Sequence, residues 1–309
     1  MSSLEILTTF DSAHIPTLDI AVQAALERFA NESLPPLSLP YERPLILGSG
    51  NAIVAAQIIF AESQAIFGDE SSYEDLLRTP ERFDSIIVMS ASGGKHAVAM
   101  CKQAQVTGLP VHLITNNQVS LAATFVPIDN VHVYPKNREP YTYNTSTYLG
   151  PILAYTKEPI EDIKTYITSQ VEPRLLRNFG DYSAFTFLLP LRFKHLRAML
   201  STKFDELFGP YVNGRFFTAE EIKHAKTVVT SGDELFISFG CNNTTYGLAK
   251  NRLEIPLSSD INYGTLMTAT YFVVGKIQAA HPPYFAMAIA SYAETASKLF
   301  GQTITPIVE

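Results

Sequence analysis

A lysine, a glutamate and a histidine form the group of residues in this sequence best suited to proton transfer. Lys203 and Glu206 stand three positions apart in a stretch with helical spacing of apolar residues, so their side chains are expected on one helix face. His224 follows further along the chain. A carboxylate beside an ammonium stays ionised and can take a proton from carbon, while the ammonium stabilises the oxyanion that forms. A lone glutamate is more often a surface residue, but three such groups in this order favour catalysis.

A serine- and glycine-rich segment offers a seat for an anion. Ser90-Ala91-Ser92-Gly93-Gly94-Lys95 follows the apolar run Ile86–Met89 and precedes a predicted helix over 95–107 and a second apolar run, Val111–Ile114. This order predicts a βαβ unit whose loop lies at the carboxyl edge of a parallel sheet. The helix-start N–H groups, the two serine hydroxyls and the Lys95 ammonium would then favour a phosphate. The alternative is a tight turn that binds nothing.

A second glycine turn has the same context. The short apolar run Leu45–Leu47 leads into Gly48-Ser49-Gly50-Asn51-Ala52 and then into an apolar helix. Nucleotide binding would need a third glycine and an acidic residue for the ribose, and neither is clear. Gly50 and Asn51 are therefore candidates for ligand contact through the backbone and the Asn51 amide, rather than evidence of a nucleotide site.

The elements that must position these residues alternate between buried strands and helices. A helix is predicted over 18–30 and a long one over 190–207, and the charged segment 156–175 is predicted to link two halves. We therefore predict an α/β fold with two doubly wound parallel-sheet domains in tandem. Residues 1–165 would form the first domain with its leading helix, and residues 166–309 the second with a C-terminal tail.

Composition narrows the class of protein. The 309 residues are 46% hydrophobic and 17% charged, which allows an ample core, and the net charge of −7 without a basic stripe argues against nucleic acid. No apolar run is long enough for a membrane span, and no signal peptide is evident at the N-terminus. Cys101 and Cys241 have no metal or redox spacing. We expect a cytoplasmic protein with no metal and no cofactor.

The anion loop resembles that of a known family. Ser90, Ser92 and Gly93 match the S-x-S-G-x-T loop with which the sugar isomerase (SIS) domain holds the phosphate of a phosphosugar, and Lys95 stands where the family has Thr. The earlier turn resembles the first SIS motif, a glycine turn followed by Thr-Ser, with Asn51 at the first of those two positions. Thr145 lies in a segment similar to the family's S-T-K helix entry. By this resemblance it contacts ligand, and the alternative is a helix cap.

The proton-transfer group resembles the same family. Lys203-Phe204-Asp205-Glu206 is similar to a K-x-x-E segment, and Glu221-Ile222-Lys223-His224 to an E-x-K-H segment, of the isomerase domain of glucosamine-6-phosphate synthase. The resemblance implies that Glu206 is the base, that His224 assists ring opening, often from the partner subunit, and that Lys298 in the tail covers the sugar. Glu221 would belong to the substrate site or cap a helix. A flavodoxin-like SIS pair and a homodimer with shared active sites are implied.

Two functional hypotheses follow. The first is an enzyme, a phosphosugar isomerase or a fructosamine-6-phosphate deglycase, which acts through an enediol as its relatives do. Glu206 and His224 favour it, because a sensor needs no base on a helix. The second is a catalytically silent sugar-phosphate sensor. Ala52, Lys95 and Ala97 favour the second, because each departs from the phosphate-site pattern of the family.

Overall fold

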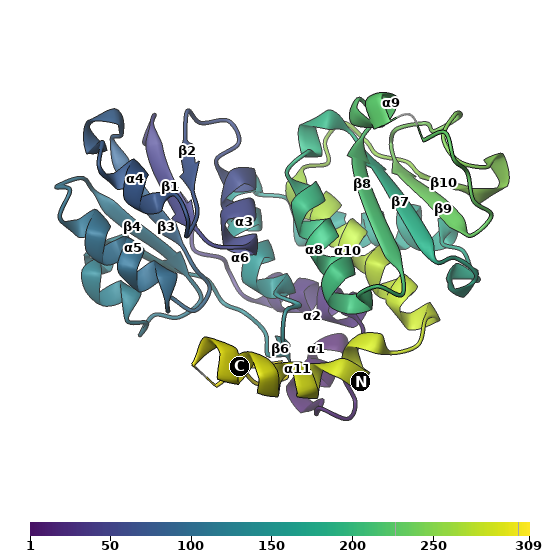
Figure 1. Cartoon of the computed structure of the whole chain (residues 1–309), viewed down its shortest axis with the longest axis horizontal. Helices are drawn as coiled ribbons and strands as arrows, with labels where there is room; N and C mark the ends of the chain where they lie inside the picture. The colour runs from purple at the N-terminus through teal and green to yellow at the C-terminus, as the bar shows by residue number, and fades with distance from the viewer. Residues whose placement is uncertain (226, 302) are drawn as a thin grey trace. The chain divides into compact units, whose positions relative to one another are not determined.

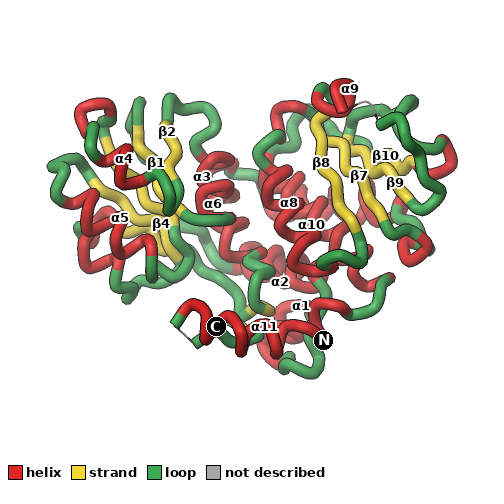
Figure 2. Tube along the Cα trace, in the orientation of Figure 1, coloured by secondary structure: helices red, strands yellow, loops and turns green. Residues whose placement is uncertain are grey.

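The computed structural model describes residues 1–225, 227–301 and 303–309. The chain packs into two compact units. The larger unit consists of Met1–Asn31, Asn137–Thr145 and Glu158–Glu309, and the smaller unit of Glu32–Lys136 and Ser146–Lys157. Each unit contains its own parallel sheet, and Figures 1 and 2 show the elements of each.

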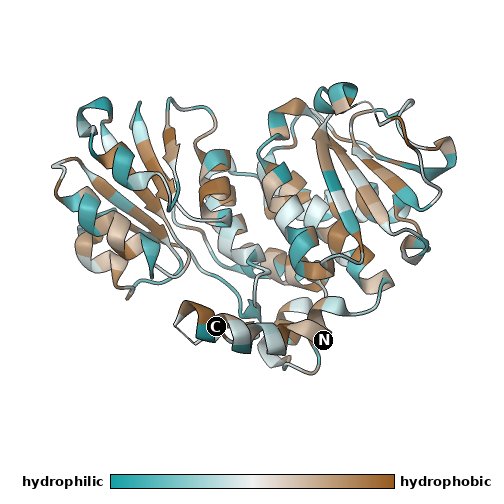
Figure 3. Cartoon of the chain, viewed as in Figure 1, coloured by the Kyte–Doolittle hydropathy of each residue, from teal (hydrophilic) through white to brown (hydrophobic). Residues whose placement is uncertain are grey.

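The smaller unit is built on a five-stranded parallel sheet with the strand order β2-β1-β3-β4-β5. Its strands are β1 (Pro44–Gly48), β2 (Ile66–Gly68), β3 (Ser85–Met89), β4 (Val111–Thr115) and β5 (Val131–Val133). Its helices are α3 (Asn51–Ile59), α4 (Tyr73–Leu77), α5 (His96–Gln105) and all but the first residue of α6 (Thr145–Thr156). The central strands β1, β3 and β4 are buried along their whole length. Their residues are mostly hydrophobic, as strands covered on both faces require (Figure 3).

The larger unit is built on a four-stranded parallel sheet with the order β10-β9-β7-β8. Its strands are β7 (Ala184–Leu189), β8 (Asn213–Thr218), β9 (Glu234–Phe239) and β10 (Arg252–Ile255). Its helices are α1 (Ser3–Thr9), α2 (Leu18–Asn31), α7 (Ile160–Tyr166), α8 (Leu196–Phe208), α9 (Glu221–Ala225), α10 (Tyr263–Ala280) and α11 (Tyr284–Phe300). Two short antiparallel strands, β6 (Glu139–Pro140) and β11 (Ile307–Val308), tie the chain end to the segment before α6.

The leading helix α2 packs against α10 within the larger unit, although we expected residues 1–31 in the first domain. The two helices approach closely at Gly275, where an added Cβ would lie 2.0 Å from the backbone nitrogen of Asp19. The Gln278 side chain accepts a hydrogen bond from the Leu18 N–H at 2.8 Å, and Lys276 pairs with Asp19 at 2.7 Å. These contacts between distant segments leave no local signal in the sequence.

The predicted α/β fold with two parallel sheets is confirmed, and most predicted elements agree with the structure. The predicted helix over 190–207 begins later, at Leu196, because Leu191–Phe193 form a 3-10 turn after Pro190. Several strands were not predicted, among them the short β2 and the strand β8, in which exposed polar residues interrupt the apolar pattern. No helix in the described part of the chain has the length and hydrophobicity needed to cross a bilayer.

Candidate functional site

In the smaller unit, two turns lie side by side at the carboxyl edge of the sheet. The turn from β1 to α3 contains Gly50, and the turn from β3 to α5 contains Gly93; β1 and β3 are paired neighbours. The strand order reverses between these two strands. In open α/β sheets a ligand binds at such a reversal, outside the carboxyl ends of the strands. The sequence-predicted phosphate loop therefore lies where this fold favours a ligand.

The hydroxyls of the loop organise its backbone. Ser90 Oγ accepts a hydrogen bond from the Gly93 N–H at 3.2 Å, and Ser92 Oγ accepts one from the Gly94 N–H at 3.3 Å. Gly93 has φ +60, and a Cβ at this position would lie 2.3 Å from Ser120 Oγ, so only glycine fits. Ser92 is exposed, whereas Gly93 is buried. The loop thus exposes the Ser92 hydroxyl on a turn that its own hydrogen bonds organise.

The helices that follow the two turns begin without side-chain caps. Gly50 precedes Asn51 in α3, and Lys95 precedes α5 with φ +38; neither position provides a side-chain hydrogen bond to its helix. Orphan N–H groups and the positive end of the dipole favour an anion at such a helix start. The exposed Lys95 adds a positive charge at the same edge. This arrangement can hold a phosphate.

The last residue of β4 and the segment after it support the loop, and this was not predicted. Thr115 donates a hydrogen bond from its hydroxyl to the Ala91 carbonyl at 3.0 Å, and the Asn117 amide donates to the Ser92 carbonyl at 3.3 Å. The signal was present in the sequence as the polar run Thr115-Asn116-Asn117 directly after a buried strand. Polar groups at neighbouring strand ends meet at one sheet edge.

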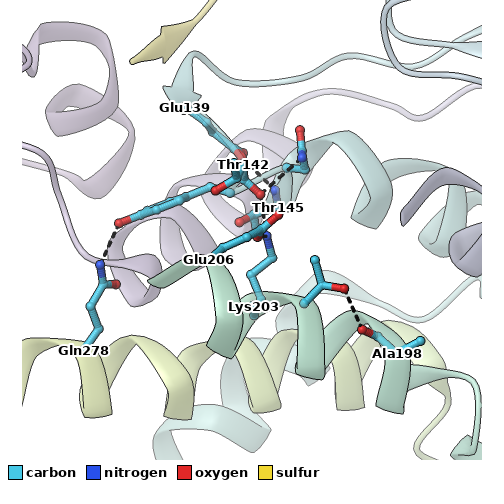
Figure 4. A network of polar contacts seen from close by, with 10 residues as sticks. Glu139, Thr142, Thr145, Ala198, Lys203, Glu206 and Gln278 are labelled. Atoms are coloured by element: carbon cyan, nitrogen blue, oxygen red, sulfur yellow. Dashed lines mark hydrogen bonds and ion pairs between the residues drawn. The ribbon is translucent and has the colours of Figure 1, made fainter. Parts of the chain in front are cut away.

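In the larger unit, Lys203 and Glu206 form an ion pair near the end of α8. Lys203 Nζ lies 2.5 Å from Glu206 Oε2 and also donates to the Thr142 carbonyl (Figure 4). The Lys203 side chain is 0% exposed, whereas that of Glu206 is 22% exposed. The predicted spacing on one helix face is therefore realised, with the lysine fully enclosed and the carboxylate at the surface of a cavity.

The carbonyl that accepts from Lys203 belongs to a strained turn. Thr142 has φ +75, a backbone conformation that a β-branched residue rarely adopts, and Asn144 has φ +49. The turn is held in place because the Tyr141 N–H donates to the Pro306 carbonyl and the Tyr143 N–H to the Pro140 carbonyl. Such strain costs on the order of 1–3 kcal/mol per residue and concentrates at functional sites.

Burial and the neighbouring Lys203 ammonium act on the pKa of the Glu206 carboxyl in opposite directions. Burial raises the pKa and is the larger effect, while the charge and the hydrogen bond of Lys203 lower it. The net pKa lies above the ordinary value of 4.5. A carboxylate with a raised pKa is a stronger base than an exposed one, and the adjacent ammonium opposes its protonation.

Glu206 lies in the wall of a cavity of about 560 Å³ within the larger unit. Asp205 and Thr142 complete the polar part of the wall. Most of the remaining lining is aromatic and comes from Tyr141, Phe208, Tyr211, Tyr284, Phe285 and Tyr292. These residues come from the segment before α6, from α8 and the turn after it, and from α11. They are far apart in sequence, so the cavity was not predicted. Its size suits a small organic ligand.

Three predicted site residues do not line this cavity. Lys298 is exposed, pairs with Glu294 at 2.8 Å and does not line the cavity. Thr145 begins α6; its N–H donates to Glu139 at 2.7 Å, and its buried hydroxyl has no partner among the described residues (Figure 4). Glu221 accepts from the N–H and hydroxyl of Thr218 and pairs with Arg197. Glu221 thus has the contacts of a helix cap, one of the two roles considered for it.

His224 lies away from Glu206 within the chain. Glu206 is in the last turn of α8, just before β8 starts, whereas His224 is in α9, which follows the end of β8 (Figure 1). A six-residue strand separates the two positions by roughly 20 Å. His224 is exposed. The structure therefore brings Lys203 and Glu206 together but does not bring His224 to them.

Among the residues that the structure describes, no three histidine, cysteine, aspartate or glutamate side chains are grouped closely enough to hold a metal ion. Cys101 and Cys241 are both free thiols. Burial raises the pKa of each thiol to about 12, so neither is a thiolate nucleophile at neutral pH.

Comparison with known proteins supports the fold. No protein-family model and no curated protein sequence matches the chain. The structure is similar to glucosamine-6-phosphate deaminase from Thermotoga maritima, with a TM-score of 0.57 and 13% identity over 90% of this chain and 94% of that one. It is also similar to tagatose-6-phosphate ketose/aldose isomerase from Escherichia coli, with a TM-score of 0.52 and 13% identity over 91% and 90% of the two chains.

A third similar structure is the C-terminal domain of glucosamine-fructose-6-phosphate aminotransferase from Francisella tularensis, with a TM-score of 0.53 and 11% identity over 90% of this chain and 95% of that one. The chain therefore has the fold of the phosphosugar isomerases and their SIS-domain relatives, as the resemblance in the sequence predicted. At these identities the similarity concerns the fold alone.

Proposed function

We propose that this protein is a phosphosugar isomerase or deglycase in which Glu206 moves a proton through an enediol. The observation that carries the proposal is the state of Glu206: a carboxylate in the wall of a cavity, with a raised pKa, held by a fully buried lysine. A structural ion pair would not need to present its carboxylate to a cavity. The fold, shared with proteins named for reactions of sugar phosphates, supports the same class of substrate.

The chemistry requires one base. Glu206 takes the proton from the carbon next to the carbonyl group and returns it to the neighbouring carbon, while the hydroxyl proton on the first of these carbons passes to the former carbonyl oxygen, so that aldose and ketose interconvert. Lys203 is a positioning residue: its ammonium orients the carboxylate and opposes its protonation before the substrate binds. Burial raises the basicity of the carboxylate, which favours proton transfer near neutral pH.

We infer that the smaller unit, taken by itself, binds an anion such as phosphate. The Ser92 hydroxyl, the N–H groups at the uncapped start of α5 and Lys95 provide donors at the sheet edge where this fold favours ligands. Gly50 and Asn51 start the neighbouring helix and would contact the same ligand. We place the reaction in the cytoplasm, where free thiols such as Cys101 and Cys241 remain reduced.

Isomerase and deglycase share the first proton transfer, and a deglycase then expels an amine from the sugar. If His224 assists ring opening, it would come from the partner subunit of a homodimer, because within one chain it lies at the other end of β8 from Glu206. Thr145 and Lys298 have no contact with the cavity, and we assign them no catalytic step.

A silent sugar-phosphate sensor is the second candidate. Ala52 lacks the hydroxyl of the family's first motif, and Lys298 is paired with Glu294 on the surface rather than placed over the cavity. Both observations weaken a complete isomerase site. A sensor would bind a sugar phosphate without exchanging any of its carbon-bound protons.

Proton exchange separates the two candidates. Hexose, hexosamine and fructose-amine 6-phosphates are incubated with the protein in D₂O, and deuterium at C1 or C2 is followed by NMR. We expect exchange with at least one of them, and a loss of about 10²–10⁴-fold in the Glu206→Gln variant. The control is Glu221→Gln, whose carboxylate serves as a helix cap. Binding without exchange in the wild-type protein would establish the sensor instead.

A further inference from the structure

The cavity beside Glu206 has a wall with an unusual concentration of aromatic rings. Four tyrosines and two phenylalanines line it. Tyr211 and Tyr284 are stacked, with ring centroids 4.4 Å apart and an interplanar angle of 12°. Tyr141 and Tyr292 approach at 6.3 Å with a tilt of 35°. Aromatic faces carry a negative quadrupole and attract a cation placed over them.

The charged residues in the cavity wall, like the aromatic rings, favour a cation. Asp205 and Glu206 are in its wall, and among the described lining residues none is a lysine, arginine or histidine. Lys203, buried behind the wall, balances the charge of Glu206. Asp205 therefore leaves a net negative charge at the exposed rim.

The Tyr141 hydroxyl does not change this balance at neutral pH. Burial, the neighbouring Tyr292 and the charge of Glu206 all raise the pKa of Tyr141. Its ring consequently remains a neutral phenol with an intact π face. A phosphate would find no positive group in this wall, whereas an ammonium group would find aromatic faces and a carboxylate.

We propose that this cavity binds an organic ammonium group, with the aromatic rings contacting its alkyl substituents and Asp205 supplying the net negative charge. The proposal deepens the proposed function, since it names the chemical group of a ligand that occupies the same site, and it rests on that function only for the role of Glu206. The ligand class is a primary or quaternary alkylammonium compound, with or without an attached sugar.

The test compares a cation with its uncharged isostere. Choline and 3,3-dimethyl-1-butanol have nearly the same shape and differ in charge, and the binding of each to the full-length protein is measured by calorimetry without any sugar phosphate. A cation–π site with a nearby carboxylate should bind choline about tenfold more tightly than the alcohol. Equal affinity for the two ligands, or no measurable binding of choline, would overturn the proposal.

Three variants locate the site. Tyr292→Phe keeps the π face and should keep choline affinity within about twofold, whereas Tyr292→Leu removes it and should weaken binding by about two- to thirtyfold. The control is Leu299→Ala on the same helix, because Leu299 is 76% exposed and does not line the cavity. If Tyr292→Leu and Leu299→Ala bind choline equally, the cation binds elsewhere and the proposal fails.

The outcomes also separate this inference from the proposed function. Deuterium exchange into a sugar phosphate that requires Glu206, together with absent choline binding, would leave the enzyme hypothesis standing and remove the ammonium site. Choline binding that depends on Tyr292, together with absent exchange, would leave an ammonium-binding protein without isomerase chemistry.

Discussion

Replacing Lys203 with methionine tests whether the buried ammonium controls the basicity of Glu206. Methionine is unbranched and of similar length, so it fills the space of a side chain that is 0% exposed without bringing a charge. In the native protein, burial raises the pKa of Glu206 while the charge and hydrogen bond of Lys203 lower it. The substitution removes the two contributions of Lys203 that lower the pKa and leaves burial and the charge of Asp205, which raise it.

The size of the shift follows from the geometry of the pair. An opposite charge within about 4–6 Å lowers a carboxyl pKa by about 1–3 units, and the ammonium lies 2.5 Å from the carboxylate. The Glu206 side chain is 22% exposed, so water screens part of the interaction. We therefore expect the pKa of Glu206 in Lys203→Met to rise by about one to two units, the lower part of that range.

The shift is measured in two ways. If the protein turns over a phosphosugar, the acidic limb of kcat/KM against pH moves upward by the same amount, because the ionised carboxylate is the active form. Independently of turnover, the ¹³C shift of the Glu206 carboxyl is titrated by NMR and assigned by its absence in Glu206→Gln. Lys298→Met is the control, because the Lys298 ammonium pairs with Glu294 on the surface.

Two results would refute the reasoning. A pKa that stays unchanged or falls in Lys203→Met would mean that the ammonium does not hold the carboxylate ionised. An equal shift in Lys298→Met would mean that overall charge, rather than the buried pair, sets the pKa.

Stability gives a further check: Glu206→Gln leaves a fully buried ammonium without its carboxylate and should cost about 3 kcal/mol of unfolding free energy, near the lower end for a broken buried pair because neutral acceptors remain.

Three further predictions concern other parts of the chain. Ser92→Ala should weaken binding of inorganic phosphate, measured by calorimetry, by about 1–2 kcal/mol, since it removes a donor to the anion. Burial and a neighbouring histidine lower the pKa of the 7% exposed His112 from 6.5 to about 4, so unfolding free energy should fall by about 3 kcal/mol as pH drops between these values, and less in His112→Gln. Gly275→Ala, which places a Cβ against the backbone of Asp19, should cost at least about 2 kcal/mol in a denaturant titration, whereas Gly232→Ala, with open space, should cost little.

The sequence sufficed to predict the fold wherever local patterns and packing agree. β3, the Ser/Gly turn, α5 and β4 follow one another in the smaller unit as predicted, because continuous apolar runs, a glycine turn and a helix-ending Gly108 each specify their element locally. β8 was missed for the converse reason. Its exposed Asn213 and Arg215 break the apolar pattern, and its pairing with β7 comes from the sheet rather than from its own composition.

The candidate site could be predicted only in its local part. The Lys203–Glu206 pair was predictable because a helix places residues three apart on one face. The partner carbonyl of Thr142 was not, because its positive φ and its approach to Lys203 depend on the chain fold around β6 and β11. The cavity joins Tyr141 and Tyr292, which are distant in sequence, and aromatic residues at helical spacing usually indicate a core.

The direction of the strands decides which residues can act together in one chain. In a parallel sheet each helix returns the chain from the carboxyl edge to the amino edge, so the end of α8 and the start of α9 fall at opposite ends of β8. Glu206 belongs to the first of these positions and His224 to the second. The pair of Lys203 and Glu206 is complete within one chain, as the proposed single-base proton transfer needs, whereas a step that also used His224 would need a second copy of the chain.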